Sequence, residues 1–341
     1  MPGKTRDRLA TGDRRLAASR PQSASLRGHV NDAGPAVGAL ARLKPALDRL
    51  YLEYNRAAVI ADPVEFVRPY EDPADREVAG FFAAGLAFGR VASVNVSVKR
   101  VLDVLGPQPA VFVRRFDPRA HARALDGFTH RWTRGPHLVE VLIALQRLIA
   151  EHGSIERAFA HGLRPEADDV GEAIESFSRR ALGLEPAAAG SRRRARVSTP
   201  HRGPGAAYFF PCPSKGSACK RMNLYLRWMV RRDAVDPGGW TRVRPSQLIV
   251  PLDTHVIRVG TCLGLTRCAT PGWTMAREIT ASLRFLSTAD PVKYDFALCH
   301  VGMRGLCGLN REQADSVCPL RGSCRPALRT RPASRAPSAR R

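Results

Sequence analysis

Apolar residues recur along most of the chain at helical spacings. Leu43, Leu47 and Leu50 follow one another at intervals of three and four residues. Similar amphipathic patterns occur in 136–151, 154–159, 170–182, 274–286 and 291–303. Such spacing places the apolar side chains on one face of a helix. The sequence contains no sustained alternation of period two and no internal repeat. It therefore predicts an all-α fold with two helical lobes.

Capping residues mark where several of these helices begin and end. Asp62-Pro63 and Asp72-Pro73 each pair an N-cap carboxylate with a proline that suits the first helical position. Gly106-Pro107 ends a later helix. The segment that begins at Asp72 is apolar almost all round, which predicts a helix buried at the centre of a bundle.

Three stretches lack this pattern and are rich in Arg, Ala, Pro, Ser or Gly. They predict a disordered basic arm (1–42), an Arg-rich loop or linker (183–205) and a disordered basic tail (325–341). The first helical lobe then spans 43–182. The second spans 206–324.

The net charge of +23 comes from 54 Lys and Arg against 31 Asp and Glu. Much of the excess lies in the three irregular stretches, because 187–205 and 325–341 hold five and six Arg and no acid. The excess positive charge has two interpretations: a general Arg-rich composition, or electrostatic attraction to the phosphate backbone of a nucleic acid. No segment approaches the roughly 20 apolar residues of a membrane helix, and none has the form of a secretion signal. We therefore expect a cytoplasmic protein whose eight cysteines form no disulfide framework.

One candidate site is a turn of small residues that leads into a helix. Gly216, Ser217 and Ala218 expose backbone N–H groups at the helix start, which suits phosphate binding. Lys220 follows in the first turn, where the helix end and nearby cations favour the neutral amine that a Schiff-base nucleophile needs. The alternative is a surface lysine beside an ordinary turn.

A second candidate site is Asp253, which follows an apolar, proline-containing segment and opens a helix. It is either an N-cap alone or, in addition, a fixed carboxylate that faces a cationic transition state. His255 beside it is either a base or a structural hydrogen-bonding group.

The two segments together resemble the helix-hairpin-helix DNA glycosylase superfamily, which includes endonuclease III and the 8-oxoguanine glycosylases. Gly216-Ser-Ala218-Cys-Lys220 is similar to its Gly-Val-Gly-x-Lys hairpin, with Ala218 in place of the second glycine. Leu252-Asp-Thr-His-Val256 is similar to its apolar-Asp-Thr-His-Val segment. Residues 43–324, apart from the Arg-rich insert, resemble more closely an uncharacterised, mostly bacterial family of conserved hypothetical proteins within that superfamily.

This resemblance implies base-excision repair of double-stranded DNA by a nucleoid-associated monomer with no membrane partner. Lys220 and Asp253 would be the catalytic residues of an N-glycosylase, with or without an AP-lyase step, and Trp228 is a candidate to stack on the extruded base. The alternative is a non-catalytic protein that keeps the hairpin for nucleic-acid binding.

The C-terminal cysteines raise the question of a metal. Cys307, Asp315, Cys318 and Cys324 approximate the spacing of the iron–sulfur loop in endonuclease III-like enzymes, and Cys299 is a candidate replacement ligand. Four-cysteine ligation is usual for such clusters, whereas zinc accepts Asp as well as Cys. An iron–sulfur cluster, a zinc ion and no metal all remain open.

Overall fold

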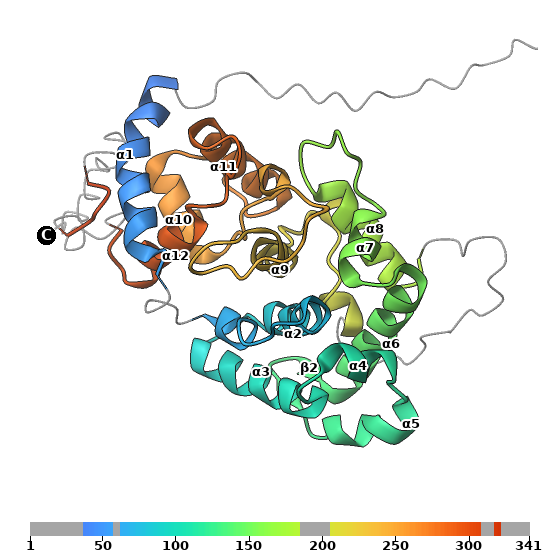
Figure 1. Cartoon of the computed structure of the whole chain (residues 1–341). Coiled ribbons are helices and arrows are strands. Elements are labelled where there is room, and N and C mark those ends of the chain that lie inside the picture. Colours follow the sequence, from blue (N-terminus) through green and yellow to red (C-terminus); the bar gives the residue numbers. More distant parts are fainter. Residues whose placement is uncertain (1–36, 57–61, 185–204, 308–316, 322–341) are drawn as a thin grey trace, which may run out of the picture. The chain divides into compact units, whose positions relative to one another are not determined.

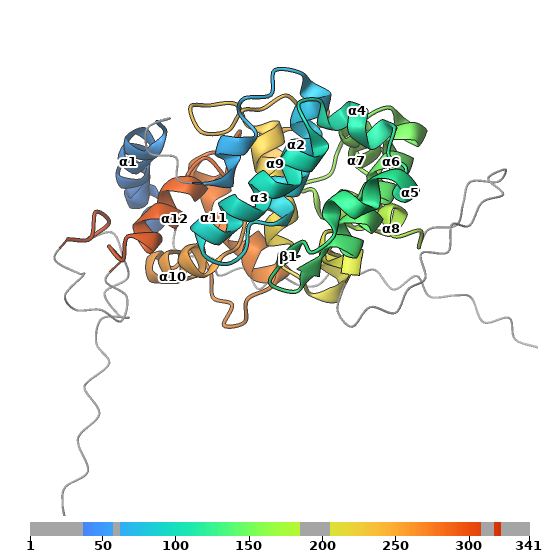
Figure 2. The ribbon, with the colours of Figure 1, turned by 90° about the horizontal axis from the view of Figure 1, so that it is seen from below.

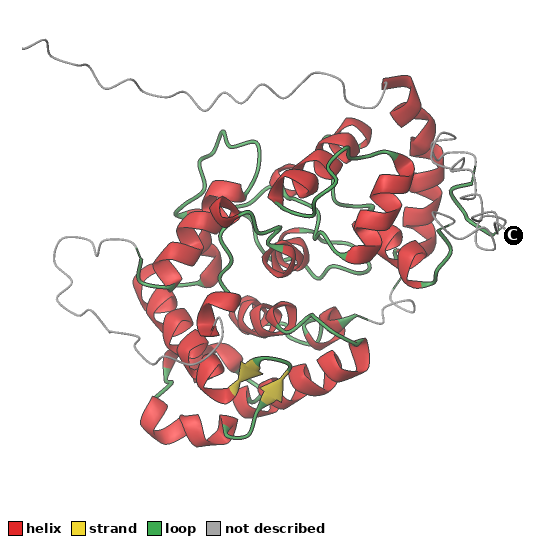
Figure 3. Cartoon of the chain, turned by 180° about the vertical axis from the view of Figure 1, so that it is seen from behind, coloured by secondary structure: helices red, strands yellow, loops and turns green. Residues whose placement is uncertain are grey.

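The structure, a computed structural model, describes residues 37–56, 62–184, 205–307 and 317–321. Within these residues the chain is predominantly helical, as the sequence predicts (Figures 1 and 3). The α-helices are α1 (Val37–Tyr54), α2 (Pro73–Gly85), α3 (Val91–Leu105), α4 (Pro109–Arg114), α5 (Pro118–His121), α6 (Gly135–His152), α7 (Ile155–Ala160), α8 (Gly171–Ala181), α9 (Lys220–Val230), α10 (Thr254–Leu263), α11 (Trp273–Leu286) and α12 (Asp295–Met303). The 3-10 turns are η2 (Pro63–Phe66), η3 (Ala122–Leu125), η4 (Gly205–Tyr208), η5 (Pro213–Lys215) and η6 (Pro245–Gln247).

The predicted caps are present at their helices. The Asp62 side chain accepts from the backbone N–H of Val64 at the start of η2, and Asp72 caps α2. Gly106, with φ of +72°, ends α3. Two boundaries differ: α1 begins inside the expected arm, and α12 begins at Asp295 because 291–294 form turns.

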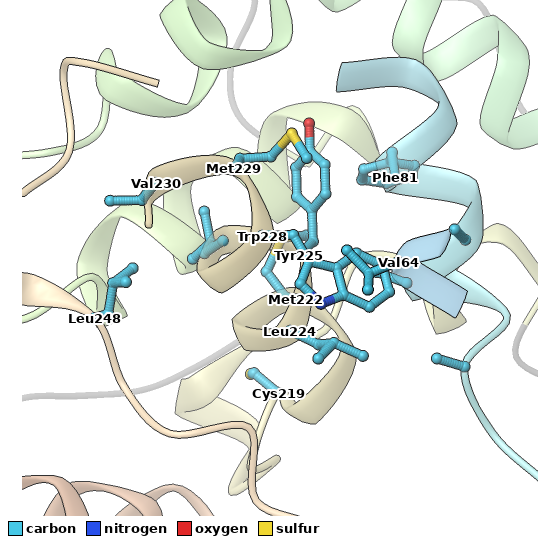
Figure 4. Packing of buried hydrophobic residues seen from close by; sticks show 14 of the residues in the cluster. Val64, Phe81, Cys219, Met222, Leu224, Tyr225, Trp228, Met229, Val230 and Leu248 are labelled. Atoms are coloured by element: carbon cyan, nitrogen blue, oxygen red, sulfur yellow. The ribbon is translucent and has the colours of Figure 1, made fainter. Parts of the chain in front are cut away.

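Helix α9 is the buried centre of the described fold. Nine of its residues, Met222 to Val230, are buried, and they pack against α2 and against residues of later loops such as Leu248 (Figure 4). Burial on all sides explains why the helix is apolar over more than one face. The segment predicted to be central, α2, is its main packing partner.

The first helix of the fold packs against the last two. Helix α1 contacts α11 and α12, and α10 also packs on α12 (Figures 1 and 2). Tyr294 donates its hydroxyl to the Asp48 carboxylate over 2.7 Å, and Lys293 pairs with the same carboxylate over 3.1 Å. The sequence placed 43–54 in the first lobe, whereas the structure attaches these residues to the C-terminal helices.

A two-stranded hairpin, absent from the sequence prediction, joins η3 to α6. Strands β1 (Thr129–His130) and β2 (Thr133–Arg134) pair in antiparallel register around a two-residue turn, Arg131-Trp132. His130 anchors the hairpin through Ser97 Oγ at 2.9 Å and the carbonyl of Phe88 at 3.0 Å. Strands of two residues are too short to produce a readable alternation.

Candidate functional site

A cavity of about 460 Å³ lies between the segments that carry the two sequence motifs. Its volume falls in the range of small-molecule and base-binding pockets. The wall comes from five parts of the chain: 62–63, 87–94, 220–227, 251–257 and 295–303. Lys220 and Asp253 both line it, so the residues that the sequence singled out share one cavity.

Lys220 is the first residue of α9 and is half-buried. Its Nζ donates a hydrogen bond to the carbonyl of Ala87 over 3.3 Å. Among the described residues, no carboxylate lies within ion-pair distance of this amine. The amine is therefore positioned by a neutral acceptor and keeps further hydrogen-bonding capacity.

Asp253 is the N-cap of α10 and also faces the cavity. Its Oδ1 accepts from the backbone N–H of His255 at 2.9 Å and of Val256 at 2.8 Å. Its Oδ2 accepts from the thiol of Cys299 over 3.2 Å. The two readings of Asp253 are therefore compatible, because the cap holds a carboxylate in place at the cavity wall.

The turn before α9 combines two left-handed residues with two open backbone N–H groups. Gly216 (φ +76°) and Cys219 (φ +49°) adopt left-handed conformations, whereas Ala218 does not. The backbone N–H groups of Ser217 and Ala218 find no acceptor in the part of the chain that the structure describes. Since position 218 needs no positive φ, alanine fits there without strain.

Two further carboxylates, which the sequence analysis did not single out as functional, line the cavity. Asp295 is 2% exposed, and its Oδ2 accepts from Arg227 over 2.7 Å, while its buried Oδ1 has no hydrogen-bond partner among the described residues. Burial raises the pKa of Asp295 to about 6, and the charge of Asp253 adds to this while Arg227 opposes it. Burial also raises the pKa of Asp62.

Arg227 supplies the compensating charge beneath this wall. It is 2% exposed and pairs with Asp236 as well as Asp295. Arg231, one turn further along α9, pairs with Asp236, Asp233 and Asp290. A buried network of this kind fixes the orientation of Asp295 in the cavity wall.

Cys299 lines the cavity beside Asp253. Burial, together with the charges of Asp253, Asp295 and Asp62, raises the pKa of its thiol well above the usual value. The thiol therefore stays protonated and donates to Asp253. The expectation that Cys299 replaces a metal ligand stays a prediction, because Asp315 and Cys324 lie outside the described residues.

The predicted stacking role of Trp228 is wrong, because this residue lies in the core. Its side chain packs among the buried hydrophobic residues of the core (Figure 4). It is 0% exposed and does not line the cavity. Phe88 and Phe296 are the aromatic residues in the wall. Trp228 fits the helical periodicity of a buried α9, which the sequence alone does not distinguish from a cavity-facing position.

The metal expectation is only partly accessible to the structure. Asp315 and Cys324 lie outside the described residues, and Cys307 and Cys318 are buried. Among the residues that are described, no three His, Cys, Asp or Glu side chains gather to hold a metal ion. The iron–sulfur cluster stays a prediction.

Sequence reasoning missed the wall formed by 87–94. Phe88 and Gly89 lie in the short link between α2 and α3 and reach the hairpin turn only through tertiary packing. The Asp62-Pro63 cap was the available signal for Asp62, since a capping carboxylate is held at a fixed point.

Comparisons with known proteins add a family. A family model described as "Protein of unknown function (DUF2400)" matches residues 62–304. No curated protein and no solved structure matches the chain. The matched range contains all segments that line the cavity. No helix within the described residues has both the length and the apolar character needed to cross a membrane.

Proposed function

We propose that this chain, which belongs to the DUF2400 family of proteins of unknown function, is a helix-hairpin-helix DNA N-glycosylase. One observation carries the proposal: the Lys220 amine and the Asp253 carboxylate line one cavity of about 460 Å³, directly beside the turn with open N–H groups. Nucleic-acid binding alone would require the turn and not the amine–carboxylate pair.

DNA binding begins with the phosphate backbone in this proposal. The N–H groups of Ser217 and Ala218, at the positive end of α9, hold one phosphate. The duplex DNA of the nucleoid is then the substrate, with one base extruded into the cavity. Phe88 and Phe296 offer apolar surface to that base.

The chemical step is attack by Lys220 on the sugar carbon C1′. Asp253 takes the proton of the ammonium group, the N–C1′ bond forms, and the bond from C1′ to the base breaks with its electron pair on the base. The leaving base needs a proton. The Asp253 carboxyl group, which holds the proton taken from Lys220, is the proposed donor.

A lyase step follows if the sugar ring opens. As the C1′–O4′ bond breaks, its electron pair goes to O4′, which takes up the proton lost from nitrogen; the products are an imine at C1′ and a free 4′-hydroxyl. Removal of a C2′ proton then expels the 3′ phosphate by β-elimination. We assign these proton transfers to Asp253, which lines the cavity at the start of α10.

Borohydride trapping tests the proposal. The full chain is incubated with duplexes that contain 8-oxoguanine, uracil, an oxidised pyrimidine or an abasic site. We expect a covalent adduct with at least one duplex, its loss in Lys220→Ala, and its retention in Lys215→Ala. Lys215 is an exposed lysine of the same turn and serves as the matched control.

The opposite result defines the competing function. If every duplex is bound but no adduct and no base release occurs with any of them, the chain is a non-catalytic nucleic-acid-binding protein. Adduct formation that persists in Lys220→Ala would assign the nucleophile to another amine.

A further inference from the structure

A second cavity, of about 560 Å³, lies next to the first and has no role in the chemistry above. Phe88 and Gly89 line both cavities, so they form a common wall. The remaining lining residues come from the start of α3 and from the hairpin: Arg90, Ala92, Ser93, Val96, Ser97, Thr129, His130 and Arg131. None of them is acidic.

An aromatic stack stands at this shared wall. The rings of Phe88 and Trp132 lie 4.9 Å apart at an angle of 21°, and Tyr208 meets both rings edge-on. Trp132, in the hairpin turn, is 42% exposed. Large aromatic side chains are usually buried, and this indole stays partly exposed although Phe88 stacks on it and the Arg131 guanidinium lies 6.0 Å from its ring centroid. Its exposed part is the surface that a planar partner could contact.

The charge around this cavity is positive. Arg90 and Arg131 are exposed and line it. Arg221 lies behind the stack with its guanidinium over the Tyr208 ring, and it donates to the carbonyls of Gly85 and Tyr208. Burial lowers the pKa of Arg221 to about 10, so it is still a cation at neutral pH.

The start of α3 adds to this field. Its N-cap, Arg90, makes no side-chain capping bond, and Ala92 and Ser93 of the first turn line the cavity. The positive end of a helix of this length favours an anion. Cations, helix end and stacking surface together fit a nucleotide, which combines a phosphate with a planar base.

The hairpin holds these groups in a fixed arrangement. His130 ties it to α3 and to the Phe88 carbonyl, and Arg131 takes a left-handed conformation with φ of +53°. The Arg131 side chain passes over Gly89, where an added Cβ would meet its Nε at 3.2 Å. A non-glycine residue is strained in this conformation, and the anchored hairpin must offset that strain.

We propose that the second cavity binds the nucleotide adjacent to the extruded one in the same DNA strand. Its phosphate lies between Arg90 and Arg131, which line the cavity, and its base contacts the exposed part of Trp132, the residue next to Arg131 in the hairpin turn. The shared wall of Phe88 and Gly89 then separates the extruded nucleotide from its neighbour. This inference rests on the proposed function for the identity of the DNA.

Equilibrium binding of the full chain to a duplex with one central tetrahydrofuran abasic analogue tests the site. The nucleotide next to the analogue is 2-aminopurine, whose fluorescence reports stacking, and all variants carry Lys220→Ala to exclude chemistry. We expect Trp132→Ala to weaken binding about tenfold and to abolish the fluorescence change, since stacking of one base contributes about 1–3 kcal/mol. Arg131→Gln should lower the slope of log affinity against log salt by about one.

Two substitutions on α11 provide matched controls. Phe285 is 49% exposed, a fraction similar to the 42% of Trp132, and Arg277 is an exposed arginine. Neither residue lines a cavity described above. Phe285→Ala and Arg277→Gln should bind like the parent. If Trp132→Ala binds as tightly as Phe285→Ala, the inference is overturned. It is also overturned if Trp132→Ala weakens binding to an undamaged duplex by the same factor.

The result separates this inference from the proposed function. Binding that depends on Trp132, without any trapped adduct in the Lys220 protein, keeps the nucleotide site and removes the glycosylase. A trapped adduct, together with DNA binding that is unchanged by substitution of Trp132 and Arg131, keeps the glycosylase and removes the nucleotide site.

Discussion

Asp253 combines a capping role and a proposed chemical role, and one substitution separates them. Asparagine is about as good an N-cap as aspartate, so Asp253→Asn should keep the melting temperature within a few degrees. It cannot take a proton from Lys220, so adduct formation should fall by two or more orders of magnitude. Thermal unfolding and trapping rates measure the two effects. Equal trapping by Asp253→Asn would contradict the proposed role.

Cys299 is a positioning residue for Asp253, because its thiol donates to Oδ2 from α12. Cys299→Ala should slow adduct formation about tenfold and shift its pH profile, since Oδ2 loses its donor. Cys299→Ser retains a donor and should recover most of the rate. If alanine and serine variants trap equally, with unchanged pH profiles, the hydrogen bond does not position the carboxylate.

At this scale the sequence predicted the residues with local signals and missed those without them. Lys220 and Asp253 stand beside a small-residue turn and an N-cap, both visible within a few residues. Phe88 and Asp295 reach the cavity only because α2, α9 and α12 pack as they do. Trp228 was wrongly favoured because a buried and a cavity-facing aromatic on α9 have the same spacing.

At the scale of elements, the turn before α9 shows why local resemblance needs geometry. The glycine expected at 218 is not required, since the left-handed residues are Gly216 and Cys219. Gly216→Ala should therefore destabilise the protein by about 1–2 kcal/mol. Ala218→Gly should cost less than about 1 kcal/mol and leave DNA affinity within twofold. Urea unfolding and fluorescence anisotropy measure these changes, and a gain of stability in Ala218→Gly would place the strain at 218.

Helix positions were largely predictable because capping residues and periodicity are both local. Asp62, Asp72 and Asp253 all cap where the sequence indicated. The beginning of α1 could not be predicted, because Val37–Arg42 lies within a stretch rich in small and polar residues. The β1–β2 hairpin was missed because its two-residue strands carry no period.

At the scale of the whole molecule, stability should depend on pH through Glu77. Its carboxylate, 6% exposed on α2, accepts from the N–H groups of Ile155 and Glu156 at the start of α7. Burial raises the pKa of Glu77 to about 7, against 4.5 for the free group. Glu77 therefore binds its proton more tightly in the folded than in the unfolded chain. Its contribution to the free energy of unfolding is fully present below pH 4.5 and is lost as the pH rises to 7.

The difference between Glu77→Gln and the parent isolates this effect. The parent should lose about 3 kcal/mol more than the variant between pH 4.5 and pH 7.5, since one pKa unit corresponds to 1.36 kcal/mol. Urea unfolding across that range gives the free energies. Parallel pH curves for the two proteins would show that Glu77 ionises as freely in the folded chain as in the unfolded one.

The packing of α1 on α11 and α12 has a consequence for biosynthesis. The ribosome makes α1 before its packing partners α11 and α12. During most of translation, nothing from these two helices covers the apolar face of α1, which is formed by Leu40, Leu43, Leu47 and Leu50. At roughly 5–20 residues per second, that interval lasts tens of seconds. The nascent chain therefore exposes an apolar helix face of the kind that a holdase chaperone binds. A stalled or truncated product lacks the α12 wall of the cavity.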